Sequence, residues 1–307
     1  MSPAPALARR DLETRAERAA AHLPGLLVAA QRIAANVVLG SHGRRRPGMG
    51  ESFWQFRPYG PDDTPGRIDW RQSARSDTLY VREREWTAAQ TVALWCDLSP
   101  SMQFRSRKEW PTKAERAAVL ALALGIVLVE GGEKILRLSS EGTPVRAATA
   151  GRLALSQMAD HLARDLAAPD DNAGDAPFPS FTQGLARYGA TVLISDFLQP
   201  LPDIAAGLSH LAGRNQSVHL VQVLDAAEET LPFTGRVRFE GLENEGAFTI
   251  DRTEDARAAY MARMAAHREA LRNMAAMYGW SFAVHRTDAS PQLTLVALHR
   301  AIGERHR

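Results

Sequence analysis

The stretch TVALWCDLSPSM, from Thr91 to Met102, carries the pattern on which the fold prediction rests. Its first six residues form a nearly continuous apolar run, which is typical of a β-strand covered on both faces. The run ends at Asp97, and two serines follow it, Ser99 and Ser101. A strand end of this kind is compatible with a helix cap, with the start of a phosphatase site, or with a metal site.

Strands and helices alternate downstream of this stretch. We expect strands at residues 133–140, 190–197, 217–225 and 280–286, and helices at residues 109–130, 152–167, 203–212, 253–278 and 291–302, with Thr253 as the cap of the fourth helix. Turn residues at 243–246 predict a β-hairpin over residues 235–250. Strands separated by helices of this length indicate an α/β fold with a mostly parallel sheet.

The region before Thr91 has a different character. Residues 1–40 are rich in Ala and predict a helical segment. Residues 41–89 are rich in Arg, Gly, Pro and aromatic residues and show no helical period, although residues 77–85 alternate as a strand does. We expect the aromatic side chains of this segment, including Trp70, to be buried. The predicted parts are therefore 1–40, 41–89 and an α/β domain at 90–307.

The composition limits the class of protein. A chain of 307 residues with 45% hydrophobic and 23% charged residues is typical of a globular protein, and a net charge of +2 argues against a general binder of nucleic acid or of membrane surfaces. The single cysteine, Cys96, excludes an intrachain disulfide and a metal site with several cysteines. No signal peptide is recognisable, and the longest apolar run, residues 117–129, is too short for a membrane span. We therefore expect a cytoplasmic protein with no membrane span.

Two strand ends supply hard oxygen atoms. Asp97, Ser99 and Ser101 follow the first strand of the domain, and Asp196 ends the strand ATVLISDF. Because parallel strands end at the same edge of a sheet, these side chains are expected to converge there. Such oxygens suit Mg²⁺, or else Mn²⁺ or Ca²⁺. In the competing structural interpretation, one of the serines caps a helix and backbone N–H groups satisfy the Asp97 carboxylate.

The residues also carry a resemblance to known families. VALWCDLSPSM followed by TVLISD resembles the von Willebrand factor A-like fold, a Rossmann-like α/β architecture with a metal-ion-dependent adhesion site. The upstream stretch GESFWQFRPYGPDDTPGRIDWRQSAR, residues 50–75, is similar to the signature of the domain of unknown function 58 family. The resemblance implies a further threonine ligand, and Thr182 is the nearest hydroxyl. The segment from Thr182 to Tyr188 is too short for the helix that usually follows it.

The resemblance further implies a function. It indicates a non-enzymatic module that acts with AAA+ ATPases of the MoxR type in metal-dependent protein assembly or chaperone-like maturation. A partner of this kind, or a client protein, would offer an acidic residue to the metal. The mixed-charge segment supplies candidate docking residues for it, which are Arg57, Arg67, Asp69, Trp70 and Arg75. The same segment has a structural interpretation as an ion-pair network that satisfies itself.

Two alternatives remain open from the residues. A magnesium-dependent phosphohydrolase of the haloacid dehalogenase type also begins with an aspartate at a strand end, but it needs a second aspartate where this chain has Ser99, and a lysine for the developing charge. The other alternative is a scaffold without metal. No phosphate-binding loop of the G-x-x-x-x-G-K type is present, so the protein is not itself the ATPase.

Overall fold

The structure is a computed structural model, and it describes residues 28–35, 47–60, 63–76, 78–85, 89–167, 178–181, 183–185, 189–241 and 246–304, apart from the side chains of residues 47–55, 67 and 82–85. The chain divides into two compact units, of which one is Ser41–Gln90 and the other comprises the residues before and after it. The larger unit carries the strand ends on which the metal prediction rests.

The larger unit alternates strands and helices much as the sequence predicts. After a helix at residues 28–35, its elements are β3 (Thr91–Cys96), the 3-10 helix η2 (Pro100–Gln103), α3 (Lys113–Glu130), β4 (Lys134–Arg137), α4 (Gly151–Ala167), β5 (Ala190–Ser195), α5 (Leu201–Ala212), β6 (Ser217–Leu224), α6 (Ala226–Thr230), β7 (Val237–Glu240), β8 (Ala247–Ile250), α7 (Thr253–Met277), β9 (Ser281–Arg286) and α8 (Pro291–Glu304). The expected hairpin is present as the antiparallel pair β7–β8. The short helix α6 is an element that the sequence analysis missed.

Five strands form one parallel sheet in the order β4-β3-β5-β6-β9. The chain leaves β3 towards one edge of the sheet to form β4, and then returns to place β5 on the other side of β3. The direction of winding therefore reverses between β3 and β5. In open α/β sheets of this kind, ligands bind beyond the carboxyl ends of the strands at such a reversal.

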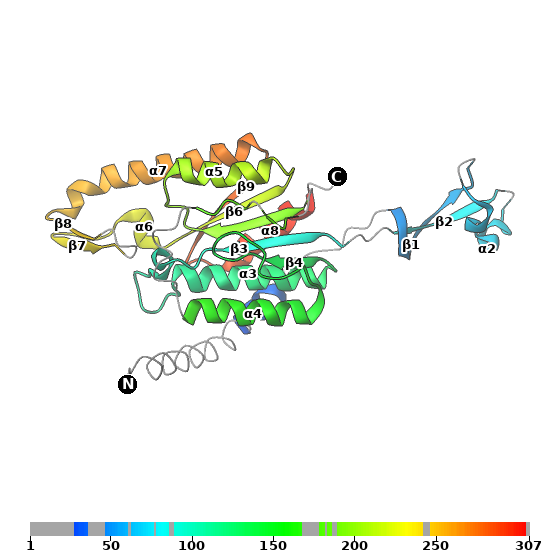
Figure 1. Ribbon diagram of the computed structural model, residues 1–307, viewed down its shortest axis with the longest axis horizontal. Helices are drawn as coiled ribbons and strands as arrows, with labels where there is room; N and C mark the ends of the chain where they lie inside the picture. The colour runs from blue at the N-terminus through cyan, green and yellow to red at the C-terminus, as the bar shows by residue number, and fades with distance from the viewer. Residues whose placement is uncertain are drawn as a thin grey trace, which may run out of the picture. The chain divides into compact units, whose positions relative to one another are not determined.

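Helices cover both faces of the sheet (Figure 1). Alternate residues of β3 enter different cores: Val92, Leu94 and Cys96 pack with α3, α4 and α8, whereas Ala93 and Trp95 pack with α5 and α7. This alternation explains the continuous apolar run, since a strand with two covered faces has no exposed side. The apolar run at residues 117–129 lies in α3 and contributes its buried face, as predicted for a core helix.

One predicted helix start and one predicted helix cap are wrong. We expected a helix from Glu109, but α3 begins at Lys113, because Thr112 and Glu115 form a capping box that fixes the first turn there. We also expected Thr253 to cap α7. Its hydroxyl instead donates a hydrogen bond to the carbonyl of Gly235, at 2.7 Å, and so fastens the helix to the hairpin that precedes it.

The smaller unit contains an antiparallel pair of strands, β1 (Pro47–Pro58) and β2 (Tyr80–Glu85). The strand predicted within residues 77–85 is confirmed as β2. The strand β1 was not predicted, because register shifts along the pair interrupt its alternation. Between the strands lie η1 (Pro65–Arg67) and α2 (Trp70–Ser73). The expectation that Trp70 is buried is wrong, since it is 65% exposed at the start of α2.

The packing of α5 gives the first prediction. A Cβ atom added at Gly207 would lie 2.4 Å from the carbonyl oxygen of Pro179 and 2.6 Å from the ring of Phe178. We expect Gly207→Ala to destabilise the fold by about 1–3 kcal/mol, because the backbone of residues 178–181 would have to move. Urea unfolding measures this change. The control is Gly213→Ala, where the nearest atoms are 3.8 Å away; equal stability of the two variants would contradict this close approach of α5 to Pro179.

The buried ring of His285 on β9 gives a prediction about pH. Burial, together with the positive charge of Arg116, lowers the pKa of His285 to about 4, and Asp288 offsets this shift only in part. In the unfolded chain the pKa of this histidine is about 6.5, so between pH 4 and pH 6.5 the unfolded chain binds more protons than the folded protein. The contribution of His285 to stability is therefore complete above about pH 6.5 and is lost as the pH falls towards 4. When the pH is lowered from 7 to 5, the free energy of unfolding measured with urea should fall by about 1–2 kcal/mol more in the wild type than in His285→Gln.

The matched control for this experiment is His210→Gln, in which an exposed histidine of α5 is replaced. This variant should keep the pH dependence of the wild type. If the stability of His285→Gln instead had the same pH dependence as that of the wild type, the His285 ring would take up its proton at the same pH in the folded and in the unfolded protein, which would contradict the prediction.

Candidate functional site

The ends of β3 and β5 bring two carboxylates to the same edge of the sheet. Asp97 follows β3 and Asp196 follows β5, and the two strands are direct neighbours. The N–H of Asp97 continues the pairing by donating to the carbonyl of Ile194, at 2.9 Å. Both residues are buried: Asp97 is 6% exposed and Asp196 is 1% exposed. The predicted convergence therefore follows from the backbone of the sheet.

The Asp97 carboxylate is held by two hydrogen bonds. The hydroxyl of Ser195 donates to its Oδ2 at 2.6 Å, and the N–H of Ser99 donates to its Oδ1 at 3.0 Å. None of the ion pairs among the described residues involves Asp97. Burial, and next to it the negative charge of Asp196, raises the pKa of Asp97, while the bonds from Ser195 and Ser99 act in the opposite direction. Within the described part of the chain, the Asp97 carboxylate therefore has no cationic partner.

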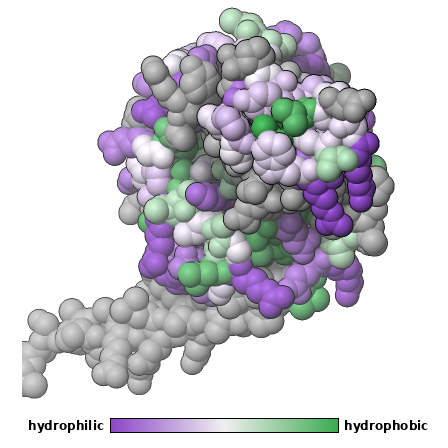
Figure 2. All heavy atoms as spheres, turned by 90° about the vertical axis from the view of Figure 1, so that its right-hand side faces the viewer, coloured by the Kyte–Doolittle hydropathy of each residue, from purple (hydrophilic) through white to green (hydrophobic). Residues whose placement is uncertain are grey.

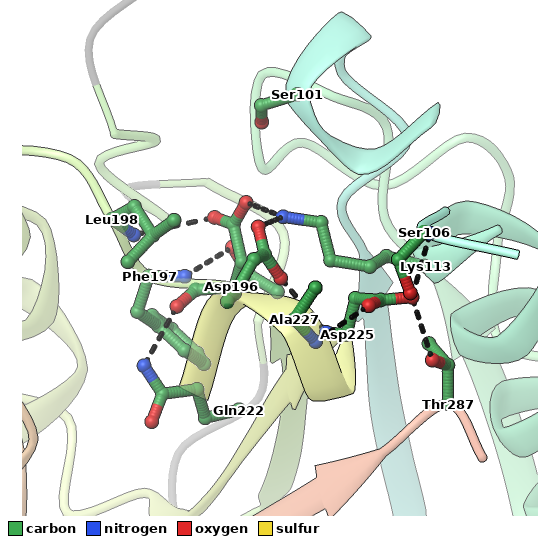
Figure 3. Close-up of polar contacts among 12 residues, drawn as sticks. Ser101, Ser106, Lys113, Asp196, Phe197, Leu198, Gln222, Asp225, Ala227 and Thr287 are labelled. Carbon is green, nitrogen blue, oxygen red and sulfur yellow. Dashed lines mark hydrogen bonds and ion pairs between the residues drawn. The ribbon is translucent and has the colours of Figure 1, made fainter. Parts of the chain in front are cut away.

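The two serine hydroxyls lie together above this edge. Ser99 and Ser101 have their Oγ atoms 3.1 Å apart. Ser99 is at the N-cap position of η2 but makes no side-chain cap bond, and Ser101 lies inside η2. Capping therefore does not explain the two hydroxyls. The structural interpretation also expected backbone N–H groups to satisfy Asp97, and the N–H of Ser99 does donate to it. In Figure 3, the hydroxyl of Ser101 is turned towards the side of Asp196 and Lys113.

The Asp196 carboxylate is satisfied within the chain. Its Oδ2 is 2.8 Å from the Nζ atom of Lys113, and its Oδ1 accepts from the N–H of Leu198 at 3.2 Å. Its backbone carbonyl accepts from the side chain of Gln222 at 2.9 Å. Unlike Asp97, Asp196 therefore has a cationic partner.

Lys113 is a buried lysine with two carboxylate partners. It begins α3 and is 1% exposed, and its Nζ lies 2.6 Å from Oε1 of Glu228. Figure 3 shows the same ammonium group beside Asp196. Burial acts to lower the pKa of Lys113, but the two carboxylates outweigh it and raise the pKa above the ordinary value. For Glu228 burial has the opposite sign: it raises the pKa of this carboxyl group, whereas the positive charge of Lys113 acts to lower it.

A third aspartate at a strand end has a structural role. Asp225 follows β6 and caps α6 by accepting from the N–H of Ala227, at 2.8 Å. It also accepts from the N–H of Ser106 and from the hydroxyl of Thr287. Figure 3 shows this group apart from the carboxylate of Asp196. Asp225 therefore ties together the loop before α3, the end of β6 and the end of β9.

The remaining predicted residues lie elsewhere. Thr182 is outside the described residues. Of the predicted docking residues, Arg57 forms a bidentate pair with Asp63, at 2.7 and 2.8 Å, and Asp69 caps α2 by accepting from Gln72. Trp70 and Arg75 are exposed, and the side chain of Arg67 is not described. The pair of Arg57 and Asp63 agrees with the interpretation of this segment as an ion-pair network.

Sequence reasoning missed three residues of the site: Lys113, Ser195 and Glu228. Two of them carry weak signals, because Lys113 lies in the capping pattern T-K-A-E and Glu228 in the capping pattern D-A-A-E. Both signals point to helix starts rather than to a shared ion pair. In the described part of the chain, no group of three or more His, Cys, Asp or Glu side chains is arranged to hold a metal. The candidate site instead combines two carboxylates with two hydroxyls.

The chain is similar to several known proteins and solved structures. The chain is 30% identical, over 276 residues, to uncharacterized proteins of Mycobacterium bovis and Mycobacterium tuberculosis, which covers 86% of this chain and 83% of each relative. Among solved structures it is similar to the conserved hypothetical protein BatB from Bacteroides thetaiotaomicron, with a TM-score of 0.42, 16% identity, and coverage of 70% of this chain and 98% of that chain.

Two further solved structures are named as membrane proteins. One is an aerotolerance-related membrane protein from Bacteroides fragilis, with a TM-score of 0.41, 16% identity, and coverage of 70% of this chain and all of that one. The other is an uncharacterized membrane spanning protein from Vibrio fischeri, with a TM-score of 0.19, 13% identity, and coverage of 71% and 98%. These names contradict the predicted cytoplasmic location, which we withdraw. Within the described residues, no helix combines the length and the apolar character needed to cross a membrane.

The family follows from a match to most of the chain. Residues 55–270 match the model of the DUF58 family, described as proteins of unknown function. The matched region begins in β1 and extends into α7, so it includes the ends of β3 and β5 and all of the residues around Lys113. The chain therefore belongs to the DUF58 family.

Proposed function

We propose that the protein is a non-enzymatic interaction module that binds a divalent cation at the ends of β3 and β5 and captures an acidic group of a partner protein there. The observation that carries this proposal is Asp97, a buried carboxylate at the reversal of the sheet, with a second carboxylate beside it and no cationic partner among the described residues. A buried charge without compensation is costly, and a bound cation would remove that cost.

The chemistry of the donors fits such an ion. The carboxylates of Asp97 and Asp196 and the hydroxyls of Ser99 and Ser101 are hard oxygen donors, which suit Mg²⁺, Mn²⁺ or Ca²⁺. These four residues are the ones that would hold the ion. The ion would supply a positive charge with a position open to a carboxylate from outside. The residues of the chain orient the site, since Ser195 and the N–H of Ser99 fix the Asp97 side chain.

The surface beside the site supports an acidic partner. The loop between η2 and α3 exposes three basic side chains, Arg105, Arg107 and Lys108. No ion pair among the described residues uses any of these three. The loop is fixed at both ends, because the N–H of Ser106 bonds to Asp225 and the N–H of Lys113 bonds to the carbonyl of Phe104. A segment that approaches the site would therefore meet an ordered, positively charged loop, which favours an acidic one.

The exposed apolar residues favour a polar contact over an apolar groove. On the face that Figure 2 shows, which is not the face at the ends of β3 and β5, the coloured hydrophobic residues form small groups among hydrophilic ones. Among the described residues, the most exposed large hydrophobic side chains are Leu293, Met277, Trp70 and Leu153, which belong to four different elements. Scattered exposed side chains of this kind are normal for a protein surface. The charges around the site are therefore the better guide to its partner.

A partner of the MoxR AAA+ type is the more specific part of the proposal. It rests on the resemblance of residues 50–75 and of the D-x-S-x-S pattern to the domain of unknown function 58 family and to von Willebrand factor A-like proteins. In the smaller unit, Trp70 and Arg75 remain exposed and so are accessible to such a partner. Arg57 and Asp69 act within the segment and shape it.

One observation favours a second candidate, a magnesium-dependent phosphohydrolase. That chemistry needs a lysine near its carboxylates, and the structure places Lys113 at 2.8 Å from Asp196. Three features stand against it. Ser99 occupies the position of the second acid, both oxygens of Asp97 already accept hydrogen bonds, and Lys113 is 1% exposed and bound to two carboxylates. We therefore retain the interaction module as the proposed function.

Metal titration tests the site. Calorimetry of the metal-stripped protein with Mg²⁺ and with Mn²⁺ should show binding in the wild type and at least a tenfold weaker affinity in Asp97→Asn, because the substitution removes the uncompensated charge. The control Asp160→Asn changes an exposed carboxylate of α4 and should bind as the wild type does.

Two results would contradict the proposal. One is the absence of binding heat with either metal in a folded wild-type protein, which would leave a scaffold without metal. The other is turnover of a phosphate ester that needs Mg²⁺ and disappears in Asp97→Asn, which would establish the phosphohydrolase.

Partner capture tests the role of the basic loop. With a MoxR-type AAA+ ATPase as the probe, the tagged protein should retain the ATPase in Mg²⁺ and release it in chelator. The double variant Arg105→Glu, Lys108→Glu should weaken capture at least tenfold while its Mg²⁺ affinity stays within about twofold, because the loop touches the partner and not the ion. Equal capture in Mg²⁺ and in chelator, or by wild type and double variant, would contradict this arrangement. The control is the exposed pair Arg236→Glu, Arg238→Glu of the hairpin segment.

A further inference from the structure

A single buried ammonium group lies among the carboxylates of the site. Nζ of Lys113 is 2.8 Å from Oδ2 of Asp196 and 2.6 Å from Oε1 of Glu228, and all three side chains are mostly or wholly withdrawn from solvent. Asp97, which has no cationic partner among the described residues, is the next carboxylate, close enough to Asp196 for the two charges to repel. Lys113 is therefore the chain's own cation at the place where a metal would be held.

We propose that Lys113 competes with the metal for Asp196, and that metal binding transfers the ammonium group from Asp196 to Glu228 alone. This inference rests on the proposed metal site. It assigns to Lys113 the role of a residue that sets the affinity of that site: the ammonium group neutralises Asp196 when no ion is bound and opposes the ion when one arrives.

The electrostatics favour an exchange over a fixed pair. A divalent ion at Asp97 and Asp196 would lie near a buried ammonium group, where the repulsion is little screened. The ion can use Asp196 only if Lys113 gives up that contact. A buried ammonium group that lost its only partner would be strongly destabilised. The second carboxylate, Glu228, removes this obstacle.

Glu228 is built to hold the ammonium group by itself. Its Oε2 accepts from the N–H of Asp225 at 2.8 Å, as part of the capping box of α6, which leaves Oε1 directed at Lys113. Its backbone carbonyl accepts from the hydroxyl of Tyr260 at 2.7 Å, so α7 holds α6 in place. The position of this carboxylate therefore depends on α6 and α7 and not on Asp196.

Two substitutions with opposite expected effects test the exchange. Lys113→Met removes the competing charge, and we expect calorimetry to show at least a tenfold higher affinity for Mg²⁺ than in the wild type. Glu228→Gln removes the alternative partner, so Lys113 stays with Asp196, and we expect at least a tenfold lower affinity. Lys134→Met, which replaces an exposed lysine of β4, is the matched control and should bind as the wild type does.

The lysine content of the chain allows a direct observation as well. Lysine occurs only at positions 108, 113 and 134, so selective ¹³C labelling yields three side-chain signals in nuclear magnetic resonance spectra. Addition of Mg²⁺ should shift the Lys113 signal, while that of Lys134 stays in place. Should Lys113→Met fold poorly, the double variant Lys113→Met, Glu228→Gln removes one charge of each sign and should also bind Mg²⁺ more tightly than Glu228→Gln alone.

The outcomes separate this inference from the proposed function. Equal Mg²⁺ affinity in the wild type, Lys113→Met and Glu228→Gln, together with an unmoved Lys113 signal, would overturn the exchange and leave the metal site intact. Binding by Lys113→Met but not by the wild type would support the competition and overturn the metal function of the natural chain. Absence of binding in every variant would overturn both.

Discussion

The in-register parallel pairing of β3 with β5 is the constraint on which the site depends. Backbone hydrogen bonds place Cys96 beside Ile194, so Asp97 and Ser195 leave the paired region next to each other. A slip of one residue would turn every side chain of one strand to the opposite face. In the observed register the neighbour of Asp97 is a hydroxyl donor, at 2.6 Å, and the two aspartates share one edge of the sheet. The geometry of the site is thus a consequence of how the core is packed.

Buried charge is the second organising feature. Asp196 and Glu228 share the single ammonium group of Lys113, and Asp97, whose charge repels that of Asp196, has no ion-pair partner among the described residues, so the carboxylates outnumber the cations in this described region. Removing one member of a buried ion pair is strongly destabilising, because its partner is left uncompensated. Groups of this kind concentrate at functional sites, where burial and neighbouring charges are arranged for a purpose. The proposed function uses the difference between Asp196, which is paired with Lys113, and Asp97, which has no ion pair with any described residue.

Much of the fold is readable from local patterns. The apolar runs predict β3, β5 and β6, and the helical period predicts α4, because buried strands and amphipathic helices leave distinct periodicities. The errors also have physical causes. α3 begins at Lys113 and not at Glu109 because a capping box fixes its first turn there, and β1 was not predicted because register shifts interrupt its alternation. Trp70 is exposed because it begins a four-residue helix that buries only Ser73.

The sequence by itself determined the strands that end in Asp97 and Asp196, the serines that follow Asp97, and the class of oxygen donors at the edge of the sheet. These features depend on residues close together in the chain, or on the rule that parallel strands end at one edge. Only the tertiary structure decided the strand order, the bond from Ser195 to Asp97, and the ion pair of Lys113 with Asp196, which are 83 positions apart. The physical reason is that a lysine in a helix cap has the same local pattern whether its ammonium group enters solvent or a buried carboxylate pair. Its environment is set by the packing of α3 and α6 against the ends of the strands.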